Sequence, residues 1–264
     1  MSITEAFSTS LDAHPIYTWT VLGVVVLGIV SFVILSFVSA PYGRHLRPGW
    51  GPTVNATALW VIMEAPSPIS FAIVYFMSDN AFKPVPLILL GMYMFHYLYR
   101  SFIYPFRMRG GHKQKPIVTG FLAFSFNTAN GSTNAFAITE LAPHLLSTAW
   151  LADPRFIVGT LVFAAGYSIN QQSDAILRNL RKPGESGYKI PHGGLYRWLS
   201  SPNYFGEIVE WIGFALAAWT VPAWVFAWFT ATNLVPRAFS NHRWYREHFS
   251  EYPENRRAII PFLL

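Results

Sequence analysis

The sequence contains no cysteine and few charged residues. With no Cys among its 264 residues, disulfides and thiolate metal ligands are excluded. Charged residues make up 12% of the chain and hydrophobic residues 52%, whereas about 25% charged residues is usual in a soluble domain. The composition therefore predicts an all-α membrane protein that forms a single domain over residues 1–264.

The sequence signatures of several kinds of site are also absent. The chain has no GxGxxG motif after a strand and no P-loop. Its His, Asp and Glu residues do not follow a metal-site spacing, and His96 stands alone in its segment, so we expect no bound metal. The net charge of +6 comes from loops between apolar segments and does not indicate nucleic-acid binding. Residues 1–14 lack Lys and Arg, which argues against a cleaved signal peptide.

Seven apolar segments are present, and they predict seven transmembrane helices. A spanning helix needs about 20 residues, so the last two segments are short, and their close spacing predicts a tight hairpin. Within the fourth segment, the stretch 127–134 is polar and has the composition of a turn. The segments are 16–38, 54–77, 85–104, 117–137, 149–170, 204–219 and 222–235.

The distribution of Lys and Arg predicts the orientation of these helices. Cytosolic loops of membrane proteins carry an excess of Lys and Arg. With seven spans, the basic stretches 44–47, 107–115, 178–197 and everything after 237 fall on one side, and Lys83 and Arg155 fall on the other. We therefore expect the N-terminus outside and the C-terminus in the cytosol. The protein is expected to be multi-pass, in a bacterial inner membrane or the endoplasmic reticulum.

One carboxylate stands out in the apolar part of the chain. Glu64 is the only acidic residue between Asp12 and Asp79. A charged side chain at the centre of a bilayer costs roughly 2.5–3.5 kcal/mol on insertion scales. We therefore expect that another group pairs with Glu64 or that a reaction uses it.

A stripe of tyrosines lies in the neighbouring segment. Tyr93, Tyr97, Arg100 and Tyr104 recur at helical spacing and share one face. Interfacial aromatic residues are one explanation of this stripe. The other is that Tyr97, deeper in the span, meets Glu64 in a dry pocket, where a neutral carboxyl and a phenol could bind a substrate carbonyl.

A second polar stripe follows the fifth segment. Asn170, Asp174, Arg178 and Arg181 recur at helical spacing before a Pro-Gly pair that ends the helix. A solvated helix end with ion pairs explains the charged members. It does not explain Asn170 on the apolar side, so a site for an anionic ligand remains the alternative.

The sixth segment continues this polar character. Asn203, Glu207 and Glu210 line one face of a helix that begins at Ser201-Pro202, and a basic stretch follows from Arg237. An acidic face within the membrane opposite a basic segment predicts a large polar ligand between them. A phosphorylated nucleotide fits, with arginines on its phosphates.

Taken together, these segments resemble the steroid 5α-reductase family over nearly the whole chain. In this family Gln commonly precedes the Glu of the first motif, where this chain has Met63, and Asn commonly stands where this chain has Met108. The matching stretches are Met63-Glu-Ala-Pro-Ser, His96-Tyr-Leu-Tyr-Arg, Leu180-Arg-Lys-Pro-Gly-Glu, Ile190-Pro-His-Gly-Gly-Leu, Asn203-Tyr-Phe-Gly-Glu-Ile-Val-Glu-Trp, Arg237-Ala-Phe and Ala258-Ile-Ile-Pro-Phe.

The resemblance implies an NADPH-dependent reductase of 3-oxo-Δ4-steroids. Residues 1–116 would then hold the substrate-side spans and 117–264 the cofactor-binding spans. Glu64 and Tyr97 would bind the 3-keto oxygen, and Trp60 and Trp211 would line the steroid-binding pocket. The residues expected to bind NADPH are Arg109, Asn170, Asp174, Arg178, Arg181, Tyr188, Asn203, Glu207, Arg237, Asn241, Tyr245 and Arg256. We expect a monomer that takes an apolar steroid or lipid substrate from the membrane lipids around it.

Three other functions stay open at this point. An integral membrane methyltransferase that uses S-adenosylmethionine has a similar C-terminal half, and the stretch 201–207 looks like its helix start. A transporter or channel could use the buried charges as an ion path, although no internal repeat is visible. A reductase of another enone or enoyl lipid would share the same residues.

Overall fold

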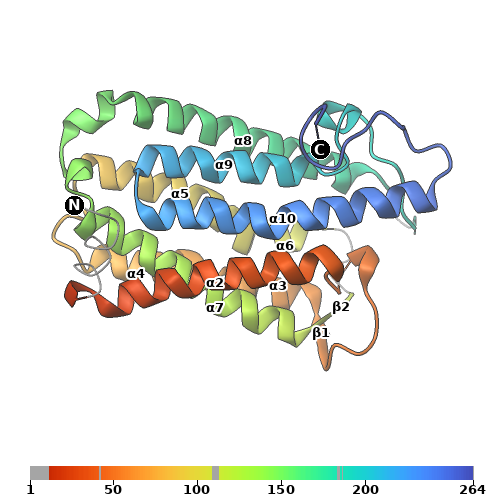
Figure 1. Ribbon diagram of the computed structural model, residues 1–264, viewed down its shortest axis with the longest axis horizontal. Coiled ribbons are helices and arrows are strands. Elements are labelled where there is room, and N and C mark those ends of the chain that lie inside the picture. Colours follow the sequence, from red (N-terminus) through yellow and green to blue (C-terminus); the bar gives the residue numbers. More distant parts are fainter. Residues whose placement is uncertain (1–11, 42, 109–112, 183–184, 186, 264) are drawn as a thin grey trace.

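The computed structural model of the chain describes residues 12–263 apart from 42, 109–112, 183–184 and 186 (Figure 1). Arg109 and the Pro-Gly pair expected to end a helix lie outside the described residues. The regular secondary structure of the described part is helical, apart from a two-stranded ladder and an isolated bridge between Leu199 and Arg257, which confirms the all-α class. Its main elements are α2 (Pro15–Phe37), β1 (Thr53–Asn55), α3 (Ala56–Glu64), α4 (Pro66–Phe76), α5 (Pro84–Phe102), α6 (Tyr104–Arg107), β2 (Gln114–Pro116), α7 (Ile117–Phe136), α8 (Pro154–Asn179), α9 (Pro202–Ala218) and α10 (Val221–His248).

The helices form a bundle in which several neighbours in space are distant in sequence (Figure 1). α8 packs along α9, α9 along α10, and α10 against the N-terminal helix α2. α2 also contacts α7, which packs on α3 and α4, while α5 contacts both α3 and α9. Residues from the two halves of the chain therefore meet in the interior of the bundle.

Glycines allow α8 and α9 to pack with their backbones in contact. A Cβ at Gly166 of α8 would clash with the backbone of Glu210, and a Cβ at Gly206 of α9 would clash with that of Asn170. Small residues permit such close approach between helices in apolar surroundings. This contact sets Asn170 directly beside the first turns of α9.

A break in the helix follows Glu64 directly. α3 ends at Glu64 and α4 begins at Pro66, which has no N–H to donate and crowds the preceding turn. α7 packs along both pieces, and Gly131 of α7 lies so close to Ser67 of α4 that a Cβ there would clash with the Ser67 carbonyl oxygen. The β1–β2 ladder ties the start of α3 to the start of α7. Glu64 thus lies at a bend that α7 covers.

The expectation of a turn-like stretch at 127–134 is wrong, because α7 runs unbroken through it. Asn127, Asn130 and Asn134 lie three and four residues apart on one helix face, and all three are buried. Asn134 Nδ2 donates to Asn130 Oδ1 at 2.9 Å, and Asn130 Nδ2 donates to the Tyr93 hydroxyl at 3.0 Å. Buried amides that are hydrogen-bonded in this way are compatible with a helix, although their composition is that of a turn.

The last two helices form the hairpin that the sequence predicts. Trp219 and Thr220 alone separate α9 from α10, and Trp219 has a left-handed φ of 48°, which reverses the chain. α10 extends to His248, past the end of its apolar segment. The extension brings the basic C-terminal stretch into the helix itself.

Two helical stretches in the described part of the chain, Pro15–Phe37 and Ala56–Phe76, are long and apolar enough to cross a membrane. Large apolar side chains on them, such as Ile16, Phe37 and Ile73, are exposed on the outside of the bundle. These features indicate membrane association. The seven-span topology and its orientation stay predictions.

Candidate active site

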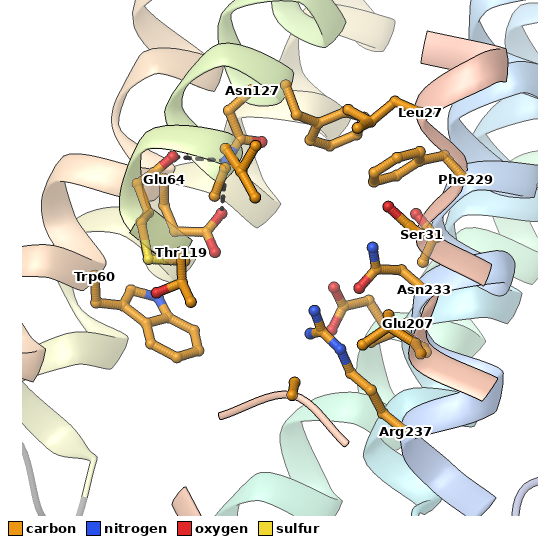
Figure 2. Close-up of a pocket in the computed structure, with 18 of the residues that line it drawn as sticks. Leu27, Ser31, Trp60, Glu64, Thr119, Asn127, Glu207, Phe229, Asn233 and Arg237 are labelled. Carbon is orange, nitrogen blue, oxygen red and sulfur yellow. Dashed lines mark hydrogen bonds between the residues drawn. The ribbon is translucent and has the colours of Figure 1, made fainter. Parts of the chain in front are cut away.

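A cavity of about 330 Å³ lies inside the bundle, within the range of roughly 300–1,000 Å³ usual for ligand pockets. α2, α3, α5, α7, α9, α10 and Lys115 of β2 line it. Figure 2 shows that residues far apart in the sequence face the same space. Its apolar wall includes Leu27, Phe126, Phe226 and Phe229, and its charged residues are Glu64, Arg100, Lys115, Glu207 and Arg237.

Glu64 and Tyr97 both line this cavity, and Asn127 of α7 contacts both. Asn127 Nδ2 donates to Glu64 Oε2 at 3.4 Å (Figure 2). Asn127 Oδ1 accepts from the Tyr97 hydroxyl at 3.5 Å. The same Nδ2 donates to the Met63 carbonyl oxygen at 2.7 Å. The structure therefore brings the predicted carboxyl and phenol together at one amide.

The opposite wall of the cavity is charged. Figure 2 shows Glu207, Asn233 and Arg237 across the space from Glu64. Arg100 Nη2 lies 3.7 Å from Glu207 Oε2, and Arg100 is one helical turn from Tyr97 on α5. α5 thus connects the wall that carries Tyr97 to the wall that carries the ion pair.

A row of polar side chains joins α8 to α9 and ends at the cavity. Asn203 Nδ2 donates to Asp174 Oδ1 at 3.0 Å. Asn170 Nδ2 donates to the Asn203 carbonyl oxygen at 3.0 Å and to Glu207 Oε2 at 3.4 Å. These four residues were predicted from the sequence as cofactor-binding residues, and the structure places them together.

Glu210 is paired inside the bundle. Its side chain is fully buried, and Oε1 lies 2.8 Å from Nδ1 of His96 on α5. The sequence placed Glu210 opposite the basic C-terminal stretch and left His96 alone, so the observed pairing corrects both expectations. Spacing could not reveal it, because 114 residues separate the two side chains.

Lys115 of β2 places a basic side chain just before the start of α7. Its side chain is 6% exposed, and its Nζ lies 4.4 Å from the centre of the Trp60 ring. Burial lowers the pKa of Lys115 to about 8, with Arg237 and Arg100 acting in the same direction, and an ionised Glu64 would oppose them. This lysine therefore titrates near neutral pH.

Aromatic rings surround Arg44, which follows α2. Its Nη2 donates to the Tyr245 hydroxyl at 3.1 Å. Its guanidinium carbon lies 4.3 Å from the ring centre of Tyr245, 4.8 Å from that of Trp244 and 5.2 Å from that of Tyr188. Tyr188 and Tyr245, both predicted cofactor residues, thus share one cation.

Two arginines have buried nitrogens that the described residues do not satisfy. Arg256 is 3% exposed, and its Nε and Nη1 have no hydrogen-bond partner among the described residues; the same is true of Arg44 Nη1. A buried donor without a partner is costly. Oxygens of a phosphate are suitable acceptors for guanidinium donors, so these atoms fit an anionic cofactor.

The remaining predicted residues occupy different places. Trp60 lines the cavity, whereas Trp211 lies in the buried core with its ring centre 5.6 Å from that of Tyr97. Arg178 is half-buried in the last turn of α8. Arg181 donates to a loop carbonyl at 2.8 Å, and Asn241 Oδ1 lies 3.3 Å from a histidine ring nitrogen.

Sequence reasoning missed Asn127, Lys115 and Arg44. For Asn127 a signal existed, because it shares a helical spacing with Asn130 and Asn134 in an otherwise apolar segment. Arg44 had no such signal, since 201 residues separate it from Tyr245.

Known proteins resemble this chain along most of its length. Residues 113–264 match the family model described as 3-oxo-5-alpha-steroid 4-dehydrogenase. The chain is 43% identical over 234 residues to 3-oxo-5-alpha-steroid 4-dehydrogenase 1 of Bos taurus, covering 86% of this chain and 89% of the relative. It is 45% identical over 228 residues to the Homo sapiens protein of that name, covering 85% and 86%.

A plant relative is similar over a longer stretch. Steroid 5-alpha-reductase DET2 of Gossypium hirsutum is 35% identical over 252 residues, which is 94% of this chain and 97% of the relative. Members of this family are oxidoreductases that act on CH–CH bonds and use a nicotinamide cofactor. The chain belongs to the 3-oxo-5-alpha-steroid 4-dehydrogenase, or steroid 5α-reductase, family.

Proposed function

We propose that the protein catalyses the NADPH-dependent reduction of the Δ4 double bond of 3-oxo-Δ4-steroids to 5α-steroids. The observation that carries this proposal is the single cavity that Glu64, Tyr97, Glu207 and Arg237 line together. It places two hydrogen-bond donors for a ketone in the same space as residues assigned to the cofactor. Its apolar wall suits a rigid apolar substrate.

Donors outside the cavity lining also fit NADPH. The unpartnered nitrogens of Arg44 and Arg256 suit phosphate oxygens, and the polar row from Asp174 to Glu207 suits the groups of a nucleotide. The residues proposed to hold the cofactor are Asn170, Asp174, Arg178, Arg181, Tyr188, Asn203, Glu207, Arg237, Asn241, Tyr245 and Arg256. Arg109 is proposed on the family resemblance alone.

Glu64 and Tyr97 are the proposed catalytic residues. When bound, the nicotinamide supplies a hydride to C5 of the steroid. Negative charge would then develop on the 3-keto oxygen of the resulting enolate, so neutral Glu64 and Tyr97 would both donate hydrogen bonds to it, and a proton from water would add to C4. Donors held in place in a water-poor site stabilise such charge by roughly 2.7–4 kcal/mol each.

We also propose that the protein is a multi-pass monomer with seven spans, the N-terminus outside and the C-terminus in the cytosol. The basic loops on one side and the exposed apolar surfaces of α2 and α4 support this arrangement. The steroid would enter from the membrane lipids. The Trp60 ring would contact the steroid within the cavity. The Trp211 ring would pack against the rings of Tyr97 and His96 and so hold them in place.

The experiment is a cofactor and product assay on purified protein in detergent. With progesterone, a 3-oxo-Δ4-steroid, NADPH should be consumed and a 5α-reduced product should form, with deuterium at C5 when deuterated NADPH is used. S-adenosylmethionine should not bind. Binding of S-adenosylmethionine instead of NADPH would favour the methyltransferase, and NADPH consumption with an enoyl lipid but not with the steroid would favour the related lipid reductases.

A further inference from the structure

Asn127 is a polar residue of the cavity to which the family resemblance assigns no role. It lies in the middle of α7, lines the cavity and is 4% exposed. A neutral amide buried among apolar helices is retained where its donors and acceptor have partners. Its partners here are the two residues proposed to bind the ketone.

The two ends of the amide have opposite polarity, and each end faces one of these residues. Nδ2 carries two protons, and it donates to the Met63 carbonyl oxygen at 2.7 Å and to Glu64 Oε2 at 3.4 Å. Oδ1 accepts from the Tyr97 hydroxyl at 3.5 Å. The short bond to the backbone fixes the amide, and the longer contact to Glu64 is of the kind that tightens when a ligand binds.

The packing of α7 determines where this amide lies. Gly131, one turn further along α7, allows close contact with Ser67 of α4, just beyond the helix break after Glu64. Met63 has no polar side-chain donor that could serve its neighbour Glu64, so the amide beside this carboxyl comes from α7. Position 127 therefore supplies a donor that the stretch around Glu64 lacks.

We propose that Asn127 is a positioning residue that presents the protons of Glu64 and Tyr97 to the substrate ketone. Because Nδ2 donates to Oε2 of Glu64, Oε2 acts as an acceptor, and the proton of the neutral carboxyl is held on Oε1. Tyr97 directs its proton to Asn127 Oδ1 until the ketone oxygen takes the place of that acceptor. The inference rests on the proposed function, since it assumes that Glu64 and Tyr97 donate to the ketone.

The test compares Asn127→Leu, which keeps the size of the side chain and removes its polar atoms, with Thr128→Val as a matched control. Thr128 lies next to it on α7, and its hydroxyl donates to the Phe124 carbonyl oxygen of the same helix. Turnover of progesterone with saturating NADPH gives kcat and KM. Binding of NADPH, followed by its fluorescence, reports whether each variant is folded.

For Asn127→Leu we expect kcat to fall by about 100-fold, the size of effect that a misplaced reacting group can have. The KM for progesterone and the affinity for NADPH should change little, because the lost contacts act on the transition state. Thr128→Val should behave as the wild type. Turnover of Asn127→Leu at the wild-type rate would overturn the inference. If this variant does not bind NADPH, Asn127→Ala decides in its place, with the same expected loss of kcat.

A double-variant cycle separates positioning from a general loss of structure. If Asn127 acts through Glu64, adding Asn127→Leu to Glu64→Gln should cause little further loss, because coupled residues are not additive. Independent, multiplying losses would contradict the inference. Absence of NADPH-dependent progesterone reduction by the wild type would refute the proposed function instead, so the two failures can be told apart.

Discussion

Two regions of the molecule bury polar groups in different ways. In the carboxyl site, formed by Glu64, Tyr97 and Asn127, each side chain contacts another member of the site. In the basic cluster, formed by Arg44, Tyr245 and Arg256, guanidinium nitrogens are buried without a hydrogen-bond partner among the described residues. The first region is organised before any ligand arrives. Under the proposed function the anionic cofactor would complete the second, so a change in each should affect a different step.

The largest expected effect is on the chemical step, from the carboxyl site. Tyr97→Phe removes one donor to the ketone and leaves the ring in place against Trp211. We expect kcat to fall by roughly 100- to 1,000-fold, the loss seen when one such donor is removed. NADPH binding should be unchanged. Steady-state kinetics together with NADPH fluorescence would check this. A weaker NADPH affinity in Tyr97→Phe would contradict the assignment of the two regions to different steps.

The next largest effect is on cofactor affinity, from the basic cluster. Arg256→Met should weaken NADPH binding by about 10- to 100-fold, since a hydrogen bond to a charged group contributes about 1.5–3 kcal/mol. The rate of reduction at saturating NADPH should stay close to that of the wild type. Exposed Arg246 offers the control variant Arg246→Met. Equal NADPH affinity in the two variants would contradict the role of the buried nitrogens.

The close helix contacts beside the two regions can be compared by making the same Gly-to-Ala substitution in each contact. Gly166→Ala and Gly131→Ala each place a Cβ against a neighbouring backbone, and such overpacking costs about 1–3 kcal/mol. Gly166→Ala should mainly weaken NADPH binding through the α8–α9 contact, and Gly131→Ala should mainly lower kcat through α7.

Gly91→Ala is the control for both, because a Cβ at Gly91 of α5 meets open space. Melting temperatures in detergent should fall for the first two variants and not for Gly91→Ala. The same pattern of kinetic change in Gly131→Ala and Gly166→Ala would show that the two contacts do not act on separate regions.

The smallest expected effect is the pH dependence of stability at Lys115, which lies between the two regions. Burial lowers its pKa from 10.5 to about 8 in the folded protein. Between these values the unfolded chain keeps a proton that the folded protein has lost, so this group makes stability rise with pH across that window. Lys115→Met should therefore melt above the wild type below pH 8, and the difference should shrink as the pH rises towards 10.5.

Lys113→Met provides the control, because Lys113 is exposed beside the same ladder. Its melting temperature should follow the wild type at each pH. A difference between Lys115→Met and the wild type that does not vary with pH would contradict the titration of Lys115.

The sequence was sufficient for the parts of the fold and site that have a local cause. Glu64 could be predicted to have a polar neighbour because a carboxylate in an apolar run is costly wherever it lies, and it lines the cavity beside Asn127. The hairpin of α9 and α10 followed from the short interval between two apolar segments. The row Asn170, Asp174 and Arg178 followed from helical spacing, and α8 confirms that these residues are on one helix.

The features that depend on contacts across the bundle could not be predicted. Asn127 is neutral, so no large desolvation cost marked it, and its neighbours have the composition of a turn. The partner of Glu210 is a histidine on α5, 114 residues earlier in the chain. Which residues share the cavity depends on close packing at Gly131 and Gly166, and a glycine in an apolar segment does not reveal which backbone will lie against it.

The most direct test of the account is a single-turnover measurement on Glu64→Gln with NADPH already bound. The account predicts that progesterone is reduced about 100- to 1,000-fold more slowly than by the wild type, with NADPH affinity unchanged. A single-turnover rate equal to that of the wild type would show that Glu64 does not polarise the ketone and would contradict the assignment of the carboxyl site.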